Sequence, residues 1–112
     1  MKLVIPCKDV IYVISQKEIT YCSAENSYAI VFLVTGEEII VSKSLSKISE
    51  QLNPDRFIRV SQSYLVNMEH VNKIDKRNKV IELFGSERIS FTVKLKTLVN
   101  ALEKVNDMSC HW

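Results

Sequence analysis

Ser61-Gln62-Ser63 is a polar tripeptide between two apolar segments, and its side chains are the first candidates for recognition chemistry in this chain. Residues 57–60 alternate in polarity and Tyr64-Leu65-Val66 is rich in strand formers, so both flanks are predicted β-strands. The carboxamide of Gln62 can form two hydrogen bonds with the N6/N7 edge of adenine, and the serine hydroxyls can reach a phosphate or a base. Rigid scaffolds often present binding groups on such loops, but a solvated turn would have the same composition.

Further polar and basic side chains are candidates for binding. Asn26 and Ser27 lie in a predicted loop. An asparagine carboxamide can form two hydrogen bonds with adenine, but in loops it often forms hydrogen bonds with its own backbone instead. Lys94 and Lys96 open the predicted C-terminal helix, where the helix dipole disfavours positive charge, so either a bound anion or simple solvation accounts for them. Arg59 faces away from its apolar neighbours and is expected either to bind a phosphate or to pair with a nearby acid.

The side chains that catalysis would need are sparse and scattered. His70 and His111 are far apart, and neither belongs to a metal-ligand spacing. There is no glycine-rich phosphate loop and no nucleophile elbow, and Glu37 and Glu38, as neighbours on a predicted strand, point to opposite faces. We therefore expect no enzymatic activity, no metal site and no cofactor.

Length and composition are typical of one ordinary globular domain. The chain has 112 residues, of which 46% are hydrophobic and 25% charged, with two Gly and two Pro. No apolar run approaches the roughly 20 residues of a membrane span, and the N-terminal run is too short for a secretory signal, so we expect a cytoplasmic protein. Cys7, Cys22 and Cys110 form an odd, widely spaced set and are expected to be reduced thiols.

Positive charge is concentrated in one part of the chain. The formal net charge is +2, but residues 1–55 carry five Lys and seven acids, whereas residues 56–96 carry nine Lys/Arg and four acids, a net charge of +5. A local positive field suits a polyanion such as a nucleic acid, although solvated charged surfaces are also common.

Short β-branched segments predict a mainly β protein. Strands are expected at residues 3–6, 10–14, 18–23, 28–34, 38–42, 57–60, 64–66, 71–74, 80–84 and 88–91. Ser44 is a good N-cap for a short inserted helix, in which Leu45, Ile48 and Leu52 repeat at helical spacing before Pro54 ends it.

A second helix is predicted near the C-terminus. Thr92 is expected to cap it, and its apolar residues, Leu95, Leu98, Val99 and Leu102, are expected on one face. One domain is predicted over residues 1–105, followed by a frayed tail, 106–112, which lacks periodicity.

Several motifs resemble those of LytTR domains, the DNA-binding output modules of many bacterial response regulators. Residues 57–67 resemble the family segment F-x-R-V-H-R-S-Y-L-V-N, and residues 89–94 resemble I-P-V-S-R-R. Residues 17–21 and 25–28 resemble the early strand and loop, and Ile5-Pro6 resembles the family's entry from a preceding linker. The resemblance covers about residues 5 to 104 and is carried by the order and spacing of these motifs.

The resemblance implies an elongated set of small antiparallel sheets with one short inserted helix and a C-terminal helix. It also implies sequence-specific binding of double-stranded DNA in bacterial transcription regulation, with loop side chains entering successive major grooves. Ser61-Gln62 aligns with H-R and Thr92-Val93-Lys94 with S-R-R, so Ser61 and Val93 depart from the family pattern. The expected DNA-binding residues are Asn26, Ser27, Arg59, Ser61, Gln62, Ser63, Lys94 and Lys96.

Two points stay open at this stage. The alternative function is a mainly β protein-interaction module of a signalling protein that has lost its DNA contacts, which the Ser61 and Val93 departures would fit. In the family the domain usually follows a receiver domain, so the chain is expected to be either a stand-alone regulator or a fragment of a longer protein, and the Ile5-Pro6 motif favours the fragment. An upstream receiver domain outside this chain and a dimer on repeated sites are the further partners expected.

Overall fold

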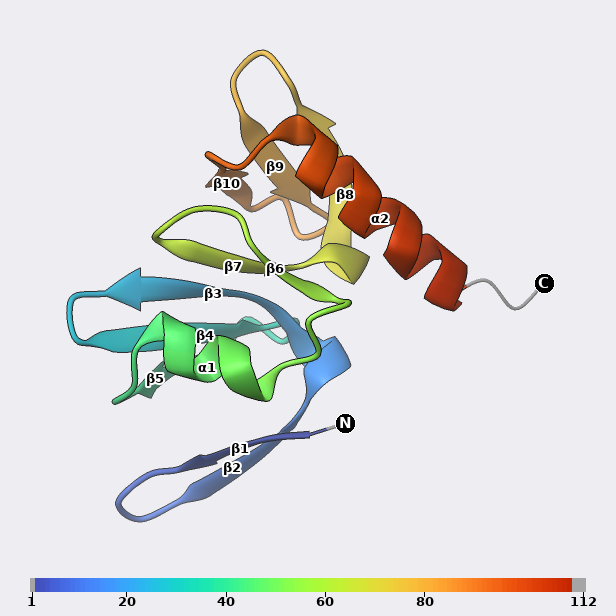
Figure 1. Ribbon diagram of the computed structural model, residues 1–112. Coiled ribbons are helices and arrows are strands. Elements are labelled where there is room, and N and C mark those ends of the chain that lie inside the picture. Colours follow the sequence, from blue (N-terminus) through green and yellow to red (C-terminus); the bar gives the residue numbers. More distant parts are fainter. Residues whose placement is uncertain (1, 110–112) are drawn as a thin grey trace.

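The computed structural model describes residues 2–109, which form three small antiparallel sheets and two α-helices (Figure 1). The first sheet pairs β1 (Lys2–Pro6) with β2 (Ile11–Ser15). The central sheet has the order β5-β4-β3-β7-β6, and the third has the order β10-β9-β8. Their strands are β3 (Ile19–Glu25), β4 (Tyr28–Leu33), β5 (Glu38–Val41), β6 (Phe57–Arg59), β7 (Tyr64–Asn67), β8 (Val71–Asp75), β9 (Val80–Leu83) and β10 (Arg88–Ser90). Each predicted strand is present, and the mainly β fold class is confirmed.

The central sheet separates two hydrophobic cores, and β7 is buried on both faces. Leu65 packs in a core with α1 (Leu45–Gln51) and the first sheet, whereas the next residue, Val66, packs in a core with the third sheet and α2 (Leu95–Ser109). Both side chains are fully buried. Successive residues of a strand point to opposite faces, so a strand with a core on each side is apolar at consecutive positions.

Helix α1 begins where its sequence predicts. Ser44 is the N-cap, and its Oγ accepts a hydrogen bond from the backbone N of Lys47 at 3.2 Å. The buried side chain of Gln16 holds the other end: its Nε2 donates to the carbonyl of Gln51, and its Oε1 accepts from the backbone N of Asn53. These bonds join a single turn of 3₁₀ helix (Gln16–Glu18) to the end of α1.

A buried asparagine joins the central sheet to the following segment. Asn67 is fully buried; its Nδ2 donates to the carbonyl of Ile19 at 2.9 Å, and its Oδ1 accepts from the backbone N of Glu69 at 3.0 Å. The second bond caps a 3₁₀ turn (Met68–His70) that leads into β8. Because a buried amide needs partners, both bonds make Asn67 a structural residue.

Helix α2 differs from its prediction in three respects. Thr92 is not its cap, since the helix begins at Leu95, directly after Lys94, whose carbonyl accepts from Thr97 N. Val99 is 39% exposed rather than on the packed face, while Leu98, Ala101 and Val105 are buried, because the contact stripe follows the spacing 98, 101, 105. The helix also continues through Ser109, so residues 106–109 are helical where a frayed tail was expected; residues 110–112, with Cys110 and His111, lie outside the described part.

Candidate nucleic-acid interface

The sheet register brings the first two candidate loops together. Strands β3 and β7 are antiparallel with Ser23 opposite Tyr64, and one residue further Ala24 N donates to the carbonyl of Ser63 at 2.9 Å. The β3–β4 turn at Asn26-Ser27 and the loop of residues 61–63 therefore leave the central sheet at the same end. Asn26 has a φ of 49°, a left-handed conformation that asparagine adopts more readily than most residues.

The third candidate loop is held against the second by backbone hydrogen bonds. The carbonyl of Val60 accepts from Thr92 N at 2.9 Å and from Val93 N at 3.3 Å. Residues 92–96, which lead from β10 into the first turn of α2, thus begin beside residues 61–63. One shallow hollow is lined by Arg59, Ser61, Gln62, Thr92 and Val93. In Figure 1 the three loops are found along the left side of the molecule, opposite the C-terminal end of α2. We call residues 26–27, 61–63 and 92–96 together the loop edge.

The predicted binding residues differ in how free their side chains are. Asn26, Ser27, Gln62, Ser63, Lys94 and Lys96 are exposed. Ser61 is half-buried, and its Oγ accepts from Ser63 N at 3.1 Å, so that hydroxyl already serves the turn itself. Among the described side chains none forms an ion pair with Lys94 or Lys96, so both ammonium groups face solvent at the loop edge.

Arg59 is directed toward the loop backbone. Its guanidinium donates to the carbonyls of Ser61 and Gln62 and to the hydroxyl of Ser46. The expected partner was a phosphate or an acid, whereas the partners within the structure are neutral oxygens, two on the loop of residues 61–63 and one on α1.

A basic turn, which is not among the binding residues predicted from the sequence, adjoins the loop edge. The turn between β8 and β9, residues 76–79, carries three exposed cations, Lys76, Arg77 and Lys79. Phe91 N donates to the carbonyl of Lys79 at 3.1 Å, which ties the turn to the segment that leads into residues 92–96. Three cations in four residues are visible in the sequence, but only the pairing of β9 with β10 shows that they lie beside residues 92–96. We call residues 76–79 the basic turn.

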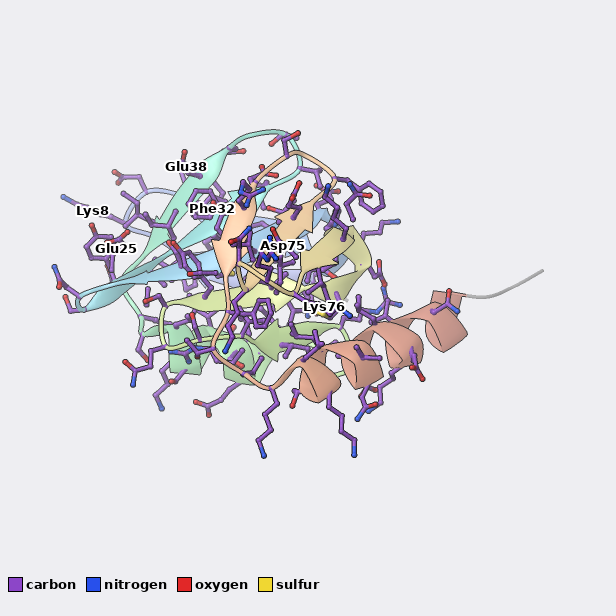
Figure 2. The ribbon with its side chains drawn as sticks, turned by 90° about the horizontal axis from the view of Figure 1, so that it is seen from above. Lys8, Glu25, Phe32, Glu38, Asp75 and Lys76 are labelled. Atoms are coloured by element: carbon purple, nitrogen blue, oxygen red, sulfur yellow. The ribbon has the colours of Figure 1, made fainter. Side chains whose placement is uncertain are left out.

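The acid that precedes this turn is hydrogen-bonded to the turn itself. The carboxylate of Asp75 accepts from the backbone N of Asn78 at 3.0 Å and from its Nδ2 at 2.8 Å. These hydrogen bonds hold the pKa of Asp75 below its ordinary value, because they favour the charged form. Figure 2, which looks down on the third sheet, labels Asp75 and Lys76 on this hairpin. The carboxylate therefore stabilises the turn while the cations point outward.

One acid opposes the positive character of the loop edge. Glu25, the last residue of β3, is exposed immediately before Asn26 and is labelled at the left in Figure 2. Its negative charge offsets positive charge at this end of the loop edge, whereas the exposed lysines of the loop edge lie within residues 92–96.

The remaining chemistry of the described residues is limited. No group of three or more His, Cys, Asp or Glu within residues 2–109 is arranged to hold a metal ion. Burial raises the pKa of the Cys22 thiol to about 12, so this thiol stays protonated in the core. None of the helices described is both long and apolar enough to cross a membrane.

The fold belongs to a class of mainly β domains with three small antiparallel sheets and two helices, and in this chain three loops lie along one edge of the molecule. The model of the LytTr DNA-binding domain family matches residues 9–103, and this chain belongs to that family. A similar solved structure is the LytTr DNA-binding domain of a Bacillus cereus protein assigned as a methyl-accepting/DNA response regulator. It has a TM-score of 0.70 at 19% identity over 93% of this chain and 94% of that one, a likeness in fold. The resemblance noted from the motifs is thereby confirmed.

Proposed function

We propose that this domain binds double-stranded DNA sequence-specifically in bacterial transcription regulation, with the loop edge as its contact surface. The observation that carries the proposal is the joining of three segments distant in the chain. Backbone hydrogen bonds connect Ala24 with Ser63, and Val60 with Thr92 and Val93, so the three loops form one continuous surface. Because the chain belongs to a family of DNA-binding domains, DNA is the ligand proposed for this surface.

The chemistry of the exposed side chains separates base readers from phosphate contacts. Gln62 and Asn26 each carry a carboxamide, the group that pairs with the N6/N7 edge of adenine in the major groove. Lys94 can donate to the O6 and N7 acceptors of guanine. Ser27, Ser63 and Lys96, together with the basic turn, are suited to phosphate oxygens, which fix the register of a protein on the duplex.

The size of the domain is compatible with contacts in more than one groove. Its longest extent is 42 Å, whereas one helical repeat of B-DNA is about 34–36 Å. The longest extent of the domain is thus comparable to the spacing between successive major grooves on one side of the duplex. Two such domains, each following a receiver domain, would suit a repeated operator.

Selection of bound duplexes from a random pool, followed by salt titration, tests the proposal. A DNA-binding domain should enrich a defined motif, and its affinity should fall by about 0.9 log units per log unit of salt for each phosphate contacted. Failure to bind any duplex at low salt would instead favour the alternative, a protein-interaction module of a signalling protein. The observation that favours this alternative is that Ser61, whose hydroxyl is used within the turn, stands where the family has histidine.

A further inference from the structure

We infer that Arg59 is a positioning residue, whose guanidinium holds the loop of residues 61–63 in the shape that presents Gln62. The inference rests on the proposed DNA-binding function and adds the residue that sets the geometry of the central loop. In this role Arg59 binds the loop backbone instead of the phosphate that its residue type alone suggests.

The guanidinium spans the loop from one side. Its Nε donates to the carbonyl of Ser61 at 2.9 Å, and its Nη2 donates to the carbonyl of Gln62 at 2.6 Å. Nη1 donates to the hydroxyl of Ser46 in the first turn of α1 at 3.3 Å. One side chain thereby links two successive loop carbonyls to the helix that packs on the central sheet.

The geometry of arginine suits this task better than that of any other residue. Its planar fork presents several N–H donors in fixed directions and remains charged, so two parallel charge-assisted bonds define an orientation as well as a distance. The carbonyl positions of residues 61 and 62 set the peptide planes on both sides of the Gln62 Cα. Fixing these planes fixes the direction in which the Gln62 side chain leaves the loop.

Other bonds complete the loop and leave the Gln62 side chain free. Val60 N donates to the carbonyl of Tyr64 at 3.0 Å across the base of the loop, and Ser63 N donates to Ser61 Oγ at 3.1 Å. Arg59 is partly buried, in contrast to the exposed Lys94 and Lys96. The loop is therefore preorganised, which lowers the entropy that binding must otherwise remove.

Two substitutions, one that keeps the positive charge and one that removes it, distinguish positioning from phosphate contact. Arg59→Lys keeps the charge but loses the fork, whereas Arg59→Gln loses both. If Arg59 positions the loop, both variants should lose about 5- to 50-fold in affinity for the selected duplex, with a flattened preference at the base pair that Gln62 reads. The slope of log affinity against log salt concentration should differ from that of the wild type by less than half of the ~0.9 units that one phosphate contact contributes. If Arg59→Lys binds like the wild type while Arg59→Gln lowers the slope by ~0.9, the inference is overturned.

A second readout does not depend on DNA. Hydrogen exchange at the amide of Ser63 in the free protein should become faster in Arg59→Lys and, to a smaller extent, in Ser46→Ala. Lys47→Gln is the control, since Lys47 is an exposed cation next to Ser46, and it should change neither exchange nor base preference. Unchanged exchange in Arg59→Lys would refute the positioning role. If the wild type binds no duplex, the proposed function fails, and exchange alone still decides whether Arg59 holds the loop.

Discussion

Replacing Gln62 with alanine separates recognition from folding at the most accessible point of the loop edge. The side chain of Gln62 is exposed, and its backbone carbonyl accepts a hydrogen bond from Arg59. Truncation beyond Cβ leaves that carbonyl in place. An exposed substitution of this kind changes the free energy of unfolding by no more than about 0.5 kcal/mol.

The expected loss in DNA binding is larger. A bidentate contact between a carboxamide and adenine contributes about 1–3 kcal/mol of discrimination, which is about 5- to 150-fold in affinity at 25 °C. Gln62→Ala should therefore weaken binding to the selected duplex by this factor, relax preference at one base pair and leave nonspecific binding unchanged. Competition binding against single-base variants of the duplex, together with thermal unfolding, provides both measurements.

A matched control is available within the chain. Gln51, an exposed glutamine in the last turn of α1, lies outside the loop edge, so Gln51→Ala should alter neither affinity nor base preference. The reasoning would be refuted if Gln62→Ala lowered the melting temperature by several degrees. Equal weakening of every duplex would also refute it, because that pattern belongs to a phosphate contact.

Three other predictions concern the core and the charges around the loop edge. Asn67→Ala should lower the free energy of unfolding by about 2–4 kcal/mol in urea titration, because it removes one buried and one partly buried hydrogen bond and leaves the Ile19 carbonyl unsatisfied. A change below about 0.5 kcal/mol would contradict this role. Glu25→Gln should strengthen binding to duplex DNA at low salt, because it removes a negative charge from the loop edge. Glu37→Gln, at the β4–β5 turn outside the loop edge, is the control and should leave binding unchanged. Equal effects of the two substitutions would count against a local interaction between Glu25 and DNA. Replacing the three cations of the basic turn with glutamine should reduce the slope of log affinity against log salt concentration by up to ~0.9 for each phosphate contacted. Lys17 is an exposed cation distant from the loop edge, so Lys17→Gln should leave this slope unchanged. An unaltered slope in the triple variant would remove the basic turn from the interface.

The sequence predicted the local structure well because the rules for strands, turns and caps act over a few residues. The alternation of Ile58, Arg59 and Val60 belongs to a strand end, and Ser44 caps α1 as its residue type predicts. Val99 shows the limit of such rules. Its spacing fits an apolar helix face, but which side of α2 is buried depends on where the third sheet lies.

The candidate site shows the same division. Residue type identified Gln62, Asn26 and Lys94 as capable of reading bases, but could not tell how free each side chain is. Ser61 and Arg59 have equally suitable polar groups, and both are engaged by the loop that they belong to. The basic turn was visible as a run of cations, yet its place beside residues 92–96 follows from the antiparallel pairing of β9 and β10.

By itself, the sequence determined the mainly β class, the ends of most elements, the family motifs and the concentration of positive charge, since each of these is a property of neighbouring residues. The tertiary structure alone decided that turns near residues 26, 62 and 94 share one edge. That arrangement depends on strand register and on the Val60 carbonyl, which accepts from residues more than thirty positions away. Contacts of this range are set by how two cores pack against the faces of one sheet, and no local pattern encodes them.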